Sequence, residues 1–274
     1  MAAPIGICAM CRKEKKVCMS HLMSAGIYPL CESDQREHVS VTSQVMRPTQ
    51  KHTKTHLLCE SCENSLSKNG ERYVLPLLSR LNGPFPLYDR LVKQTPLELL
   101  HGYPIYAAAS NPEIDVAKLI HFGIGILWKA SVHPFGNGDS PRIDLGADSD
   151  ALRIFLLGES PLPNHMALAV AVEPDPIRYP AIIEPFPGDN PDFKNFFFYV
   201  PGMMMQLYIG DDVRKAKGAY SINLNPLAPI FLQPLAKNVR GSLSKNSVES
   251  YRTEKLLKII ADNEAQGLNI RLGN

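Results

Sequence analysis

Two cysteine pairs, Cys8-Ala9-Met10-Cys11 and Cys59-Glu60-Ser61-Cys62, decide how the first part of this chain folds. Two residues between the cysteines of a pair let one tight turn aim both thiolates at a single ion, and four thiolates are the number that a closed structural zinc site needs. Helix-like residues follow the second pair, which indicates that this pair opens a helix. The spacing therefore predicts a structural Zn²⁺ site formed by Cys8, Cys11, Cys59 and Cys62.

Two other interpretations of the cysteines stay open. The N-terminus lacks the basic-then-apolar layout of a signal peptide, so we expect a cytoplasmic protein with reduced cysteines. These can simply be buried thiols. A local set, Cys8, Cys11, Cys18 and His21, also has plausible zinc spacing, C-x2-C-x6-C-x2-H. On the preferred interpretation Cys18 and Cys31 bind no metal.

The overall composition is that of a globular protein, with 45% apolar and 20% charged residues among 274. Because 29 basic residues face 27 acidic ones, the charge balance of the whole chain neither requires nor excludes a nucleic-acid partner. No apolar run approaches the roughly 20 residues that cross a bilayer, so we expect no membrane partner. The chain also lacks a P-loop, a Rossmann fingerprint and a G-x-S-x-G elbow.

The second part of the chain has the pattern of an α+β domain. Residues 114–130 are apolar on most sides, which predicts a buried central helix that starts at an Asn111-Pro112-Glu113 cap. Strand-like runs then follow one another without helical crossovers, which favours a mainly antiparallel sheet. We expect these strands at 165–172, 181–183, 196–200, 203–209 and 230–233, with further helices at 149–157 and 247–265. The pattern divides the chain into two domains, residues 1–100 and 101–274.

The region between the cysteines and the central helix is less regular. After Cys62 the pattern is helical, and Asn69-Gly70 and Pro76 predict interruptions. Residues 88–100 predict another short helix. Residues 47–56 are polar and basic without an acidic residue, which predicts an exposed loop.

The segments around the cysteines resemble the zinc-bearing HNH nuclease superfamily. They are similar to bacterial proteins with an SHIIP-like segment and an LLC-x2-CE segment, and Trp128-Lys129 resembles a Trp-Arg pair of the same group. The resemblance covers roughly residues 5–80 and implies a treble-clef zinc domain, in which a knuckle carries the first cysteine pair and a helix the second. The matching stretches are Cys8-x2-Cys11, Ser20-His21-Leu22-Met23-Ser24-Ala25-Gly26-Ile27-Tyr28 and Leu58-Cys59-x2-Cys62-Glu63-Asn64.

This resemblance implies metal-dependent cleavage of nucleic acid, in a setting such as bacterial defence. His21 is the expected general base that activates water, and Glu63, with Asn64 beside it, the expected ligand of a catalytic Mg²⁺ or Mn²⁺. Ser20 stands where the family has an acidic residue, Glu63 where it has a histidine, and Ser24 where the SHIIP-like segment has proline. The alternative is a non-catalytic treble clef that binds nucleic acid or a partner protein.

For the nuclease, and equally for a non-catalytic treble clef that binds nucleic acid, the predicted phosphate contacts are Arg47, Lys51 and Lys54. The alternative for these residues is a charged loop that is merely solvated.

Overall fold

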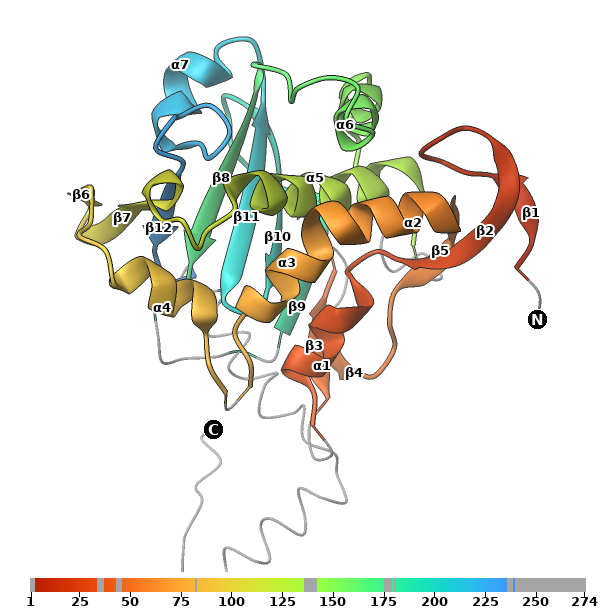
Figure 1. Cartoon of the computed structure of the whole chain (residues 1–274), viewed down its shortest axis with the longest axis horizontal. Coiled ribbons are helices and arrows are strands. Elements are labelled where there is room, and N and C mark those ends of the chain that lie inside the picture. The colour runs from red at the N-terminus through yellow and green to blue at the C-terminus, as the bar shows by residue number, and fades with distance from the viewer. Residues whose placement is uncertain are drawn as a thin grey trace, which may run out of the picture.

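A computed structural model of the chain describes residues 3–33, 37–42, 46–81, 83–135, 142–174, 179, 181–235 and 239. Within these residues the strands form two sheets (Figure 1). The smaller sheet has the order β1-β2-β5, with β1 (Ile5–Ile7), β2 (Glu14–His21) and β5 (Lys54–Cys59).

The larger sheet has nine described strands in the order β4-β3-β9-β10-β11-β8-β12-β7-β6. The pairs β3–β9 and β8–β12 are parallel, and its other described pairs are antiparallel, so the expectation of an α+β protein with a mainly antiparallel sheet is confirmed. The strands are β3 (His38–Val41), β4 (Met46–Thr49), β6 (Glu98–Leu100), β7 (Tyr103–Ala107), β8 (Met166–Val172), β9 (Ala181–Pro187), β10 (Lys194–Val200), β11 (Met203–Ile209) and β12 (Pro229–Leu232).

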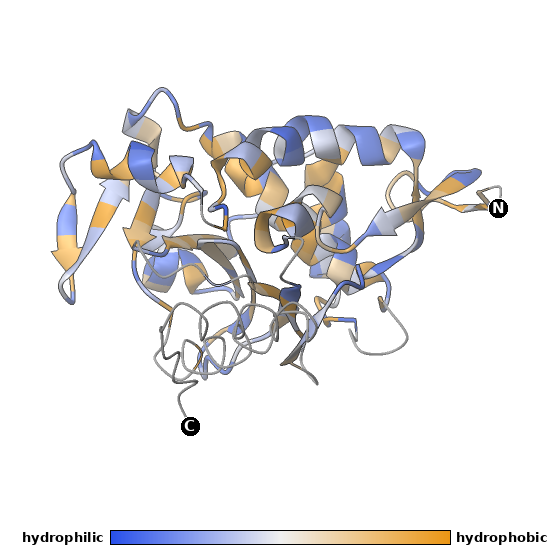
Figure 2. Cartoon of the chain, turned by 90° about the horizontal axis from the view of Figure 1, so that it is seen from below, coloured by the Kyte–Doolittle hydropathy of each residue, from blue (hydrophilic) through white to orange (hydrophobic). Residues whose placement is uncertain are grey.

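The longest described helix, α5, crosses the large sheet, and α2 and α3 run beside it (Figure 1). Figure 2 shows hydrophobic residues concentrated on the central helices, next to hydrophilic stretches of the same helices. The described helices are α1 (Tyr28–Cys31), α2 (Glu60–Leu66), α3 (Arg72–Val74), α4 (Pro86–Val92), α5 (Val116–Val132), α6 (Asp148–Leu156) and α7 (Val213–Lys217).

Helix α5 is the buried central helix that the sequence predicts, but its start differs. Asp115 is the N-cap, because its side chain accepts a hydrogen bond from the Lys118 amide at 3.1 Å. Asn111 instead closes a turn by accepting from the Glu113 amide at 2.9 Å. Gly123 lets the sheet approach closely, since a Cβ there would lie 2.5 Å from Met205 Sδ.

The interruption predicted at Asn69-Gly70 is a π-turn, Ser67–Glu71, which joins α2 to α3 without ending the helical course. The second predicted interruption, at Pro76, is a 3-10 turn, Leu75–Leu77. Two local predictions are wrong. The helix predicted at 88–100 ends at Val92 and is followed by β6. The loop predicted at 47–56 is mostly strand, with β4 and β5 flanking residues 50–53. The predicted strands from 165 to 233 and the helix at 149–157 are present, and residues 247–265 lie outside the described part of the chain.

Contacts join the first hundred residues to the rest of the molecule. Strand β3 pairs with β9 in the large sheet, with Val39 opposite Ala181. One hydrophobic cluster contains Cys8 and Cys59 together with Trp128 and Met205. The cysteine-rich segment is therefore packed onto the sheet through α2 and α5.

Candidate metal centre and active site

Four thiols gather where the small sheet meets α2. Cys8 and Cys11 lie in the turn between β1 and β2, Cys59 ends β5 and precedes α2, and Cys62 lies in the first turn of that helix. Their Sγ atoms all lie within 4.8 Å of one another. The turn is closed by the Arg12 amide, which donates to the Cys8 carbonyl at 2.9 Å, and Arg12 adopts a left-handed φ of 57°.

The geometry of this group fits a tetrahedral metal. Zn–S bonds of about 2.3 Å place two thiolates of a tetrahedral site about 3.8 Å apart, and Cys11 Sγ lies 3.9 Å from Cys59 Sγ. The Cys59 amide also donates to Cys8 Sγ at 3.3 Å, as an amide that supports a bound thiolate does. The four cysteines can therefore hold a metal ion such as zinc.

The environment of the thiols differs from one to the next. Burial opposes the charged form of Cys59, yet hydrogen bonds from the Ser61 side chain and the Cys62 amide lower its pKa to about 6. Burial raises the pKa of Cys8 and of Cys62. A metal that binds here releases protons from these thiols.

The two remaining cysteines lie outside the group. Cys18 is on β2 and is half-buried, whereas Cys31 is fully buried on α1 with its thiol 3.8 Å from the Ala181 carbonyl. Within the described residues, the group of clustered metal-ligating side chains contains neither Cys18 nor His21. The geometry thus favours the four-cysteine set over the local alternative.

His21 is the last residue of β2, the strand that leaves the cysteine turn. Its partner across the sheet is Lys54 on β5, whose side chain is exposed. Burial lowers the pKa of His21, and the charges of His52, Lys54 and Lys129 lower it further. The carboxylate that acts in the opposite direction is that of Glu71.

A buried lysine holds the backbone of His21. Lys129 of α5 is 2% exposed, and its Nζ donates to the His21 carbonyl at 2.9 Å. The same Nζ lies 3.6 Å from Glu71 Oε1, which also accepts from Ser24 Oγ at 2.6 Å. These four residues, Ser24, Glu71, Lys129 and His21, form a network that we call the lysine network.

The sequence alone does not predict this network. The local pattern fits Glu71 equally well as a solvated helix residue, and it singles out Lys129 only through the resemblance of Trp128-Lys129 to a Trp-Arg pair. A usable signal is present, because a lysine in the most apolar helix of a chain must find a partner. The π-turn brings Glu71 to that lysine, and such turns occur often at functional sites.

The other predicted catalytic residues lie apart from this network. Glu63 and Asn64 are on α2, and Asn64 is exposed. Within the described part of the chain, the Oε1 atom of Glu63 is buried and has no hydrogen-bond partner, and burial and the Glu63 charge both raise the pKa of Cys18. Ser20 is 1% exposed and accepts from the Leu58 amide at 3.1 Å, so its hydroxyl joins β2 to β5.

Lys51 lies in the loop at residues 50–53, and the other two predicted phosphate contacts, Arg47 and Lys54, lie on the strands on either side of it. Lys51 and Lys54 are exposed, and Lys54 stands across the sheet from His21. Arg47 lies on β4 opposite Ser40, and its side chain is outside the described residues. An exposed cation therefore neighbours the predicted general base.

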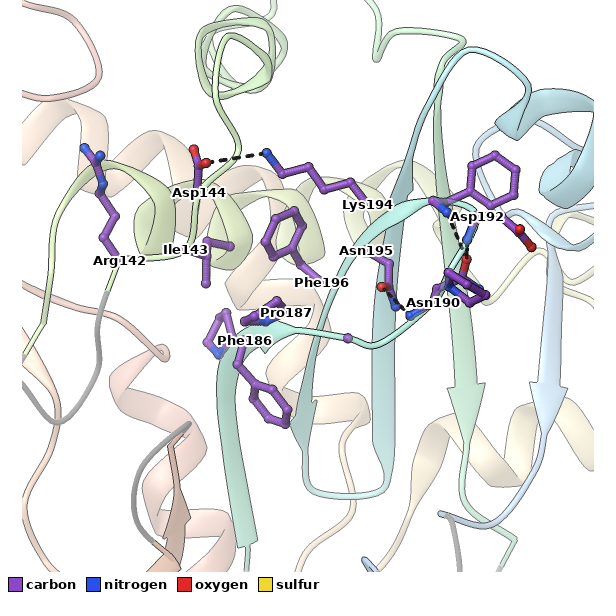
Figure 3. A pocket seen from close by; sticks show the side chains of 14 residues that line it. Arg142, Ile143, Asp144, Phe186, Pro187, Asn190, Asp192, Lys194, Asn195 and Phe196 are labelled. Carbon is purple, nitrogen blue, oxygen red and sulfur yellow. Dashed lines mark hydrogen bonds and ion pairs between the residues drawn. The ribbon is translucent and has the colours of Figure 1, made fainter.

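A separate hollow of about 570 Å³ opens where β9 and β10 meet residues 142–144 (Figure 3). Phe196 and Ile143 point into it, and Lys194 spans its rim to Asp144 at 3.8 Å. None of the site residues predicted from the sequence lines this hollow.

No protein-family model, curated protein or solved structure matches the chain. The HNH-like interpretation therefore depends on this chain's own residues and their geometry. Among the described residues, no helix combines the length and apolarity needed to span a bilayer.

Proposed function

We propose that the chain is an HNH-like nuclease whose zinc-bound treble clef positions His21 to cleave phosphodiester bonds. A cysteine turn between two strands, followed by a strand that leads into a cysteine-bearing helix, is the order that a treble clef requires. The observation that carries the proposal is the position of His21. It is a half-buried histidine whose backbone is fixed by a buried lysine and whose cross-strand neighbour is an exposed cation.

Each of these groups has a role in phosphodiester cleavage. His21, with a lowered pKa, is neutral near pH 7 and can take the proton from the attacking oxygen. Lys54 lies where its charge attracts the phosphate. The lysine network holds the end of β2, so that the imidazole keeps its direction while the substrate binds.

A catalytic Mg²⁺ or Mn²⁺ is part of this proposal. Glu63 would hold the ion, because its buried Oε1 has no hydrogen bond from any of the residues that the structure describes, and a carboxylate oxygen suits such hard cations. The ion supplies charge neutralisation at the phosphate. Asn64 is exposed one residue further along α2.

Removal of the His21 side chain tests the activity. We expect His21→Ala to lower turnover on nucleic acid about 100-fold or more, with zinc content and unfolding midpoint retained. His101→Asn is the matched control, because His101 is exposed at a left-handed φ of 51° that asparagine accepts.

The alternative is a treble clef that only binds nucleic acid or a partner protein, and the exposed Lys51 and Lys54 favour a nucleic-acid partner. In that case the wild-type protein cleaves neither DNA nor RNA with Mg²⁺ or Mn²⁺. Replacement of Arg47, Lys51 and Lys54 by Ala then weakens binding and flattens its salt dependence by roughly 0.7–0.9 slope units for each phosphate that the protein no longer neutralises.

A further inference from the structure

A second histidine stands beside His21. His52 lies in the loop between β4 and β5, and its ring centroid is 5.6 Å from that of His21. Neither ring is fully buried, and the His52 side chain is 31% exposed. Two imidazoles at this separation are close enough to contact two different oxygens of one phosphoryl group.

The loop holds His52 in place through its neighbours. The His52 ring stacks on Tyr28, with centroids 3.7 Å apart and an angle of 8° between the planes. The Thr53 amide donates to the Tyr28 hydroxyl at 3.3 Å, and the Thr53 carbonyl accepts from the Leu22 amide at 2.9 Å. The Thr53 hydroxyl donates to the Glu184 carboxylate. These contacts fix the loop against its surroundings, which a loop that is only a solvated charged surface does not require.

The two histidines have different electrostatic surroundings. Burial lowers the pKa of His21, and the charges of His52, Lys54 and Lys129 lower it further against the opposing charge of Glu71. Burial also lowers the pKa of His52, but there the leading charge is that of Glu32, which raises the pKa against His38 and Lys54 and has a carboxylate oxygen 4.0 Å from His52 Nε2. When the environments of two neighbouring titratable groups push their pKa values apart, the group with the lower pKa can act as the base and the other as the acid.

We propose that His21 and His52 are the general base and general acid of one phosphoryl transfer, and that the substrate is RNA. This inference rests on the proposed nuclease function. His21 takes the proton of the ribose 2′-hydroxyl, and O2′ forms a bond to phosphorus. The P–O5′ bond breaks, and O5′ leaves with a proton from His52. The products are a 2′,3′-cyclic phosphate and a 5′-hydroxyl, with no net change in protons.

RNA fits this pair because it carries its own nucleophile. The 2′-hydroxyl is already next to the phosphorus, so the protein needs only to remove one proton and supply another. Lys54, across the strand from His21, lies close enough to both histidines to act on the pKa of each, and so can offset charge on the phosphoryl oxygens.

The pair also implies an acidic pH optimum. Burial lowers the pKa of both histidines, so the state with neutral His21 and protonated His52 is most populated below about pH 6.5, the ordinary histidine value. The groups that face the pair are Tyr28 of α1, Glu32 directly after α1, His38 of β3, Lys54 of β5, Glu71 of the π-turn and Lys129 of α5.

The decisive variant is His52→Phe in the full-length protein, because phenylalanine keeps the ring on Tyr28 and removes the proton donor. We expect turnover on single-stranded RNA to fall about 100-fold or more, with 2′,3′-cyclic phosphate ends from the wild-type protein. On uridine 3′-(4-nitrophenyl phosphate), whose leaving group needs no proton, His52→Phe should match the wild type while His21→Ala stays slow. His101→Asn should match the wild type on both substrates.

Other outcomes overturn the inference in distinguishable ways. Equal cleavage of DNA and RNA to 5′-phosphate ends, dependent on His21 but not on His52, removes the acid–base pair and leaves the nuclease in place. An equal loss of both activities in His52→Phe reduces His52 to a packing residue. No cleavage of either nucleic acid removes the inference together with the proposed function.

Discussion

Lys129 is a buried cation beside the site. It is a charged side chain with 2% exposure, and its partners are the His21 carbonyl and the Glu71 carboxylate. A buried ammonium of this kind is tolerated only when it is paired, because desolvation costs several kcal/mol per ion. The pair thus couples the stability of the core to the position of His21.

A double-mutant cycle measures that coupling. We expect Lys129→Met to destabilise the protein by about 3 kcal/mol, since removal of one partner leaves a partly buried carboxylate unpaired. Glu71→Gln should also destabilise, and the double variant should cost less than the sum of the two, with a coupling of about 1–3 kcal/mol in urea unfolding.

Lys129→Arg is the matched control for charge. It keeps the cation near Glu71, so its loss of stability should reflect only the fit of a larger head group. Strict additivity of the two single variants would show that the 3.6 Å approach between Lys129 and Glu71 contributes no net interaction.

At the scale of elements, the joint between α2 and α3 depends on one glycine. Gly70 packs against the backbone of α5, where an added Cβ would lie 2.9 Å from both N and Cα of Phe122. Backbone atoms cannot move aside as a flexible side chain can. The π-turn around Gly70 is therefore fixed by helix packing, and Glu71 follows it.

Gly70→Ala tests this packing. Alanine favours a helix by about 1 kcal/mol over glycine, yet we expect a net destabilisation of about 1–3 kcal/mol because the helices must separate. Asn69→Ala, at the exposed preceding position, should change stability by no more than about 0.5 kcal/mol. A Gly70→Ala protein as stable as the wild type in urea unfolding would show that α5 can move away from residue 70 at little cost in free energy.

The sequence predicts those elements whose pattern is local. Helix α5 and strands β8 to β12 follow from unbroken apolar periodicity, and the cysteine group follows from its spacing. Strand β3 escapes prediction because its partner β9 lies about 140 residues away, and β4 because most of its residues belong to the stretch with the pattern of a polar loop. The role of Glu71 escapes prediction for the same reason, since its partner Lys129 is far along the chain.

At the scale of the whole molecule, the cysteine group is continuous with the core. Cys8, Cys59 and Cys62 belong to the same hydrophobic cluster as Trp128 and the large sheet. Loss of a bound metal should therefore weaken the entire fold and not only the first strands.

Zinc content and thermal unfolding test this continuity. We expect one zinc per chain, and Cys59→Ser should release it and lower Tm by roughly 10 °C, as loss of about 4 kcal/mol of ligand stabilisation does in a chain of this size. Cys18→Ser, outside the group, should retain the metal. Zinc lost from Cys18→Ser but kept by Cys59→Ser would support the local set Cys8, Cys11, Cys18 and His21 instead.

The parallel pairing of β3 with β9 also sets an order of events during synthesis. Residues 8–62 contain every cysteine of the group and leave the ribosome before β9 does, so a metal can bind the first strands while β9 is still untranslated. Strand β3 must wait for residues 181–183 before its edge is paired. In that interval β3 and β4 form an open hairpin, which is an edge that other nascent chains can pair with. A metal bound to the cysteine pairs on both sides of this hairpin would hold the hairpin near the small sheet and so limit such pairing.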